Sequence, residues 1–130
     1  MIAIPNDIPR IVAEAKAQAY KFPYLRPDPE RMYDLARLAV TSRQHFACVN
    51  ETGVLVALSD KHLWAEKMMA QVVLWSGDFS LVREYRDWLE DRPAIRMGCI
   101  DFACKYDRRI GHKLIRMGFR QDGDIYIWRR

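Results

Sequence analysis

The spacing of apolar residues predicts two helices at the start of the chain. Apolar side chains fall on one helical face over about residues 8–20, and Asp7 is placed to cap that helix. A proline-rich loop follows. Asp28 is then expected to cap a second helix over about residues 29–42.

Strand patterns take over after these helices. Two antiparallel strands are predicted at residues 46–49 and 54–58, and the Asn50-Glu51-Thr52-Gly53 turn between them suits a hairpin because glycine can adopt positive φ. Residues 59–66 are polar and predict an irregular loop. Residues 67–75 predict a third strand, whose continuous apolar run is typical of a central strand buried on both faces.

The rest of the chain alternates between helix and strand patterns. We expect a helix over residues 79–91, a strand over 94–103, a helix from about 107 and a strand over 125–128. Gly118 is expected to end the last helix in the left-handed conformation, and Phe119 to enter the core. This order predicts an α/β (α+β) fold with a mixed sheet and helices on both faces, to which residues 1–4 add an optional strand.

Composition fits a soluble globular protein. The 130 residues are enough for one domain, 1–130, and 50% of them are hydrophobic. No apolar run approaches the ~20 residues that span a bilayer, and the first residues do not resemble a signal peptide, so we expect a cytoplasmic protein. The net charge of +4 favours anionic partners such as a CoA phosphate, nucleic acid or an acidic protein.

The cysteines and histidines indicate no metal site. Cys48, Cys99 and Cys104 are an odd number, lie in apolar or strand-like stretches and lack CxxC spacing, so we expect reduced, buried thiols. The histidines have no ligand spacing either.

The closing segment resembles a known family. The helix over residues 107–117, Gly118-Phe119 and the strand over residues 125–128 are similar to the end of the GNAT superfamily of N-acetyltransferases. The hairpin and the segment Leu81-Val82-Arg83-Glu84-Tyr85-Arg86-Asp87-Trp88-Leu89 resemble the same family, and the likeness covers essentially the whole chain. Segment by segment, the sequence most resembles short bacteriophage-encoded members of that family. The resemblance implies a GNAT-like acyl-CoA N-acyltransferase fold, acetyl-CoA as the cofactor and an amine as the acceptor.

The resemblance also implies a cofactor cradle at the turn after the third strand. In the family, a Gln/Arg-x-x-Gly-x-Gly/Ala loop at a helix N-terminus holds the diphosphate. The positions that correspond to this cradle are Leu74, Trp75, Ser76, Gly77, Phe79, Ser80, Leu81 and Arg83. The turn has a single glycine and places Asp78 where a diphosphate is expected. The competing interpretation is that Asp78 caps its own helix and Leu81 enters the core.

Candidates for proton transfer lie before the third strand and around the last helix. The family pattern often has a tyrosine that protonates the thiolate, and that position is Leu114 here. Tyr106 and His112 are the nearby substitutes in sequence. Glu66 and His62 are the candidates for deprotonating the amine.

Two other functions are consistent with the sequence. In the first, a catalytically silent GNAT-fold phage protein serves as a virion component or binds a host factor, since fold does not fix function. In the second, the arginines near the C-terminus bind nucleic acid, although no binding motif supports this. No membrane partner is expected.

Overall fold

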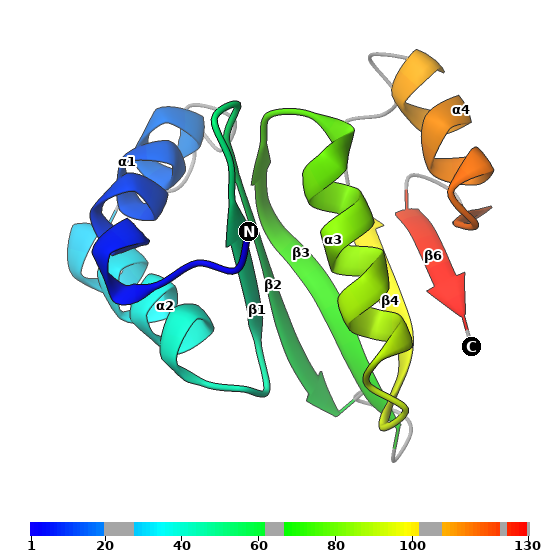
Figure 1. The fold of residues 1–130 in the computed structure, drawn as a ribbon, viewed down its shortest axis with the longest axis horizontal. Helices are drawn as coiled ribbons and strands as arrows, with labels where there is room; N and C mark the ends of the chain where they lie inside the picture. The colour runs from blue at the N-terminus through cyan, green and yellow to red at the C-terminus, as the bar shows by residue number, and fades with distance from the viewer. Residues whose placement is uncertain (20–27, 62–66, 102–107, 123–124, 130) are drawn as a thin grey trace.

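A computed structural model describes residues 1–19, 28–61, 67–101, 108–122 and 125–129. Its elements follow the predicted order (Figure 1). They are η1 (Pro5–Asp7), α1 (Ile8–Gln18), α2 (Pro29–Thr41), β1 (Phe46–Val49), β2 (Val54–Lys61), β3 (Met68–Ser76), α3 (Phe79–Glu90), β4 (Ile95–Asp101), α4 (Arg108–Arg116), β5 (Arg120–Asp122) and β6 (Ile125–Arg129).

The strands form one mixed sheet in the order β1-β2-β3-β4-β6-β5. Neighbouring strands are antiparallel except for β3 and β4, which are parallel because α3 carries the chain back across the sheet between them. The predicted mixed sheet with helices on both faces is therefore confirmed. The expected N-terminal strand is reduced to one isolated bridge between Ile2 and Cys48.

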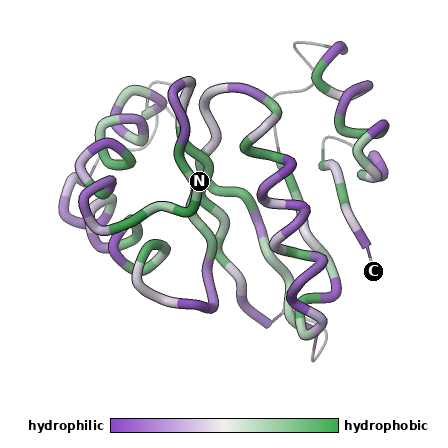
Figure 2. The backbone as a smooth tube through the Cα atoms, in the orientation of Figure 1, coloured by the Kyte–Doolittle hydropathy of each residue, from purple (hydrophilic) through white to green (hydrophobic). Residues whose placement is uncertain are grey.

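Each face of the sheet has its own hydrophobic core. One core joins α1 and α2 to the face that carries Val54 and Val56. The other joins α3 and α4 to the opposite face, which carries Leu55 and Ala57. The alternation along β2 divides its side chains between the two cores. Figure 2 shows hydrophobic residues along the central strands and hydrophilic residues recurring along the helices.

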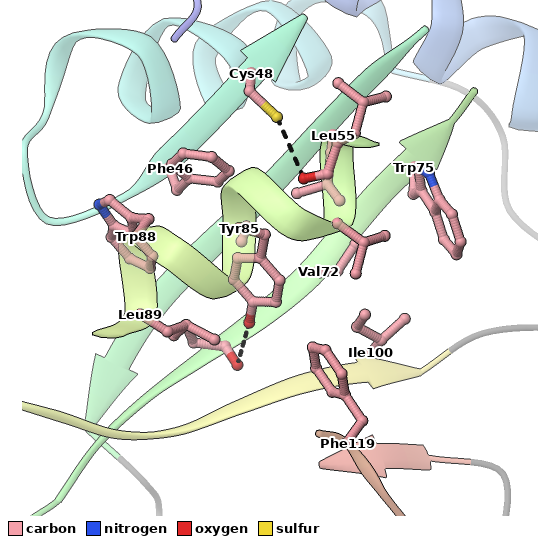
Figure 3. Packing of buried hydrophobic residues seen from close by; sticks show 14 of the residues in the cluster. Phe46, Cys48, Leu55, Val72, Trp75, Tyr85, Trp88, Leu89, Ile100 and Phe119 are labelled. Atoms are coloured by element: carbon pink, nitrogen blue, oxygen red, sulfur yellow. Dashed lines mark hydrogen bonds between the residues drawn. The ribbon is translucent and has the colours of Figure 1, made fainter. Parts of the chain in front are cut away.

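Aromatic side chains of α3 fill the second core. Tyr85 is fully buried and donates a hydrogen bond to the carbonyl of Ala70 in β3, at 3.3 Å (Figure 3). Phe46 stacks on Trp88 with ring centroids 5.2 Å apart. These contacts hold α3 against the middle of the sheet, so that its N-terminus lies at the carboxyl end of β3.

The turns and caps confirm several local predictions. Asp28 accepts a hydrogen bond from the Arg31 amide at 3.2 Å and caps α2. Gly118 has a φ of 99°, and Phe119 is buried. Asp7 occupies the N-cap position of α1, but its carboxylate accepts instead from the Ile4 amide at 2.9 Å.

Two segments differ from the predicted elements. Residues 59–61, predicted as part of an irregular loop, extend β2, where backbone pairing with β3 needs no apolar side chain. Between Phe119 and the predicted last strand, where no element was predicted, the short strand β5 pairs with β6. Cys48 and Cys99 are buried free thiols, as expected, whereas Cys104 lies outside the described residues.

Candidate functional site

The pairing between β3 and β4 ends before β3 does. The last pair is Val72 with Ile100, while β3 continues to Ser76 and stays paired with β2 as far as Val54. In Figure 3, the strand that carries Trp75 and the strand that carries Ile100 separate toward their carboxyl ends. Within the described part of the chain, β4 therefore does not pair residues 73–76. The Trp75 carbonyl accepts instead from the side-chain amide of Gln18 at 3.0 Å.

A β-bulge lies at the point of separation. Val56 of β2 pairs with Leu74, and Ala57 pairs with Val72, so Val73 is an extra residue in β3. A bulge bends its strand and increases the local twist, which accounts for the departure of β3 from β4. Val73 is 53% exposed, although it belongs to an apolar run. The bulge thus creates an opening between two strands of an otherwise continuous sheet.

The turn after β3 brings α3 to this opening. Gly77 has a φ of 103°, which an L side chain rarely adopts. Asp78 caps α3 by accepting from the Ser80 amide at 3.2 Å, and it also accepts from the Asn50 side-chain amide at 3.1 Å. Hydrogen bonds from Ser80 and Asn50 lower the pKa of Asp78. The predicted capping role of Asp78 is confirmed, so a carboxylate occupies the start of α3.

The β1–β2 hairpin is seated tightly on the same turn. The Asp78 amide donates to Thr52 Oγ1 at 3.0 Å. Asn50 Oδ1 accepts from the amides of Thr52 at 2.8 Å and Gly53 at 3.1 Å. A Cβ on Gly53 would lie 2.0 Å from the carbonyl oxygen of Ser76. Hairpin and turn therefore form one close-packed unit.

A cation from α4 lies beside the first turn of α3. The Lys113 Nζ is 4.8 Å from the ring centroid of Phe79. Further along, Arg86 of α3 donates to the carbonyl of Met117 at 3.3 Å, which fixes the end of α4 against α3. The side chain of Lys113 is exposed. An anion at the start of α3 would therefore meet the positive charge of Lys113 and the negative charge of Asp78.

Comparisons with known proteins identify this architecture by structure alone. A GNAT-family acetyltransferase from Streptococcus pneumoniae superposes with a TM-score of 0.65 at 13% identity, covering 98% of this chain and 94% of that one. The chain has the GNAT fold. The aminoglycoside acetyltransferase AAC(6')-Ib in complex with coenzyme A gives a TM-score of 0.59 at 15% identity, covering 100% and 93%. No protein-family model and no curated protein matches the sequence.

Within this GNAT fold, several predicted cradle residues turn their side chains into the cores. Leu74 is buried in the core beneath α1 and α2. Trp75 and Leu81 are buried in the core beneath α3 and α4. These three residues can offer a ligand only their backbone, because their side chains have no access to the opening.

The other predicted cradle residues lie at the surface or at its edge. Ser76 Oγ accepts from the Val54 amide at 3.4 Å, which ties it to the hairpin. Phe79 is half-buried and meets Trp75 edge-on at 5.3 Å. Gly77, Ser80 and Arg83 are exposed. The side chain of Lys113 also lies at this turn, beside Phe79. No pattern in the sequence predicted this contact between α4 and the start of α3.

Of the candidates for proton transfer, only His112 is among the described residues, and it is exposed on α4. Glu66, His62 and Tyr106 belong to segments that the structure does not describe. Leu114, at the position of the family tyrosine, is fully buried. Among the described residues, no cluster of His, Cys, Asp or Glu is suited to a metal ion, and no helix is long and apolar enough to span a membrane.

Proposed function

We propose that this chain is an acetyl-CoA-dependent N-acetyltransferase that acts on an amine of a small molecule or a protein. The observation that carries the proposal is the opening between β3 and β4 beside the Val73 bulge. The pantetheine arm of acetyl-CoA contains amides at strand-like spacing, and such amides can pair with the backbone of β3 beyond Val72, which β4 does not reach.

The opening suits acyl transfer as well as binding. A thioester laid along this part of β3 brings its carbonyl to the bulge, and we propose a backbone N–H of this stretch as the donor that stabilises the developing oxyanion. The amine nitrogen attacks the thioester carbon, the C–S bond breaks, and the amine proton must be removed. Holding amine and thioester together supplies a large part of the rate enhancement without any single catalytic side chain.

The phosphate end of the cofactor fits less well than the pantetheine arm. Lys113 provides one exposed cation beside α3. Asp78, however, already accepts the Ser80 amide, which is one of the donors that a helix N-terminus would offer a diphosphate. We therefore assign the diphosphate to the Lys113 side of the turn and not to the helix axis.

Proton transfer is assigned from the family resemblance. Glu66 or His62 is proposed to deprotonate the amine, Glu66 through a water molecule, and Tyr106 is proposed to protonate the departing thiolate. The acceptor is left as an amine. An aminoglycoside belongs in a first substrate panel because structural neighbours are aminoglycoside acetyltransferases.

The occupied start of α3 favours a second candidate function. A GNAT scaffold whose diphosphate position holds a carboxylate suits a catalytically silent protein, used as a phage virion component or to bind a host factor. Such a protein would bind neither acetyl-CoA nor CoA.

Isothermal titration with acetyl-CoA and with CoA at low salt tests the first proposal. We expect micromolar binding of both. The Lys113→Gln variant should weaken it by about threefold to tenfold at low salt and by less at high salt, because an exposed charge is screened. Lys16→Gln, which removes an exposed lysine from α1, is the matched control and should change nothing.

Turnover then separates enzyme from scaffold. With an amine panel, Glu66→Gln should lower kcat while leaving the acetyl-CoA dissociation constant unchanged. No binding at millimolar cofactor would exclude the acetyltransferase and leave the silent scaffold. Binding without turnover on the panel would contradict that silent scaffold, which binds neither donor, and would direct the search to other amines.

A further inference from the structure

The outer surface of α4 is basic, with an apolar centre. Ile115, which is 49% exposed, is surrounded by exposed basic residues. We use the name α4 basic face for Ile115 together with Arg109, His112, Lys113 and Arg116 of α4 and Arg120 of β5. Among the ion pairs of the described residues, none involves Lys113, Arg116 or Arg120. The opposite side of α4 is committed to the core, where Leu114 is fully buried.

The α4 basic face borders the opening in the sheet. Lys113 lies 4.8 Å from the Phe79 ring, at the turn that leads out of β3. Arg86 of α3 holds the end of α4 through the Met117 carbonyl. Figure 1 shows α4 beside the upper end of α3, where β3 turns into that helix. A thioester arm that enters between β3 and β4 must therefore pass close to α4.

The surroundings of the α3 N-terminus disfavour a free diphosphate. Asp78 caps the helix, and the hairpin packs behind it. A hollow of about 520 Å³ beside the hairpin is lined in part by three acidic residues, Asp7, Glu51 and Asp78, and by two that carry positive charge, Arg10 and the N-terminal Met1. A donor that carries a single phosphodiester needs only one cation near the opening, and Lys113 supplies it.

We propose that the acyl donor is a phosphopantetheine thioester attached to an acidic protein, which docks on the α4 basic face. This inference rests on the proposed acetyltransferase function and changes only the donor. The acyl group passes from the sulfur of the protein-bound arm to the amine nitrogen, the C–S bond breaks, and the carrier protein leaves with a free thiol. The negative charge of the carrier complements the basic face, and Ile115 provides the apolar centre that a protein interface needs.

A nucleic acid fits the same surface less well. Ile115 lies where a phosphate backbone would otherwise run, and the net charge of +4 over 130 residues is modest. No aromatic side chain belongs to the described part of α4, so this helix offers no stacking platform for bases. The α4 basic face also lies close to an opening that suits a thioester arm. A carrier protein would use that opening, whereas a nucleic acid would not.

Titration of the full chain at low salt tests the donor. The probes are an acidic acyl carrier protein in its acetylated holo form, the same protein without phosphopantetheine, acetyl-CoA, and double-stranded DNA. We expect the acetylated carrier to bind about tenfold more tightly than acetyl-CoA, and the form without the arm to bind more weakly than the acetylated carrier.

Charge reversal locates the docking surface. Arg116→Glu should weaken binding of the acetylated carrier by about tenfold and leave acetyl-CoA within about twofold. Arg31→Glu, the same charge change on an exposed position of α2, is the matched control and should leave both unchanged. Arg120→Glu repeats the test from β5 if circular dichroism shows that the Arg116 variant does not fold.

The outcomes separate the donor from the function. If acetyl-CoA binds at least as tightly as the acetylated carrier, or if the charge reversals leave the carrier's affinity unchanged, the docking inference fails and the proposed function stands. If DNA binds more tightly than the carrier and loses affinity in the same variants, the face belongs to nucleic acid and the inference is overturned. If neither acetylated donor binds, the proposed function fails with it.

Discussion

Replacing Gly77 by alanine tests whether the hairpin and the turn before α3 form one close-packed unit. A Cβ at this position would lie 2.7 Å from Thr52 Oγ1 and 2.9 Å from the Gly53 nitrogen. Gly77 also has a φ of 103°. The substitution therefore adds two separate costs, one from the backbone conformation and one from the contact with the hairpin.

The two costs can be separated with a second glycine. Placing an L side chain in a left-handed conformation costs about 1–2 kcal/mol. Gly118 has a similar φ of 99°, but its Cβ would meet only Trp128 Cδ1 at 4.0 Å, an ordinary contact. Forcing an extra methyl group against a well-packed segment costs a further amount of about 1–3 kcal/mol. We therefore expect Gly77→Ala to lose about 2–5 kcal/mol and Gly118→Ala about 1–2 kcal/mol.

Urea denaturation followed by circular dichroism measures both variants. The comparison is valid if the dependence of the unfolding free energy on urea concentration is unchanged, since that slope reports the surface exposed on unfolding. Equal losses for the two variants would show that the hairpin is not seated on Gly77. Thr52 would then not be packed against the turn before α3.

Two further substitutions test the core on the α3 side. Leu81→Ala should destabilise the fold by about 2–5 kcal/mol in urea denaturation, since Leu81 is fully buried, while the acetyl-CoA affinity of the remaining folded protein stays unchanged. Tyr85→Phe removes the hydrogen bond to the Ala70 carbonyl and should cost about 0.5–1.5 kcal/mol at neutral pH. Burial raises the pKa of Tyr85 well above its usual range, so its neutral form is favoured in the folded state. Stability should therefore fall as the pH rises above the unfolded value of about 10, and thermal unfolding of Tyr85→Phe should show a smaller fall over that range.

The closing part of the fold was predictable because its residues have strong local preferences. Gly118 adopts positive φ, and the Phe119 amide donates to the Leu114 carbonyl at 3.1 Å, which ends α4 as the Gly-Phe pair predicts. The strand β5 was missed because its residues are polar and exposed. What makes these residues a strand is their backbone pairing with β6, and backbone pairing does not require a particular pattern of side chains.

The candidate site was less predictable than the fold. Val72, Val73, Leu74 and Trp75 are all apolar, so the run indicated a strand buried on both faces and gave no sign that Val73 is an extra residue in a bulge. Lys113 was missed for a different reason. It reaches α3 through the packing of two helices that are far apart in the sequence, and no local pattern encodes that approach.

The two halves of the proposed donor site depend on different properties of the chain. The opening beside β3 is a backbone feature, because it follows from a bulge and from the end of pairing at Val72, and many side chains are compatible with it. The phosphate end depends on charge, and a single carboxylate at Asp78 changes it without disturbing the fold, since that carboxylate also caps α3. Recognition of the pantetheine arm can therefore persist while recognition of the diphosphate changes. The donor should then be selected by the group to which the pantetheine arm is attached. Within the described surface, the exposed cations of α4 are placed to bind that group.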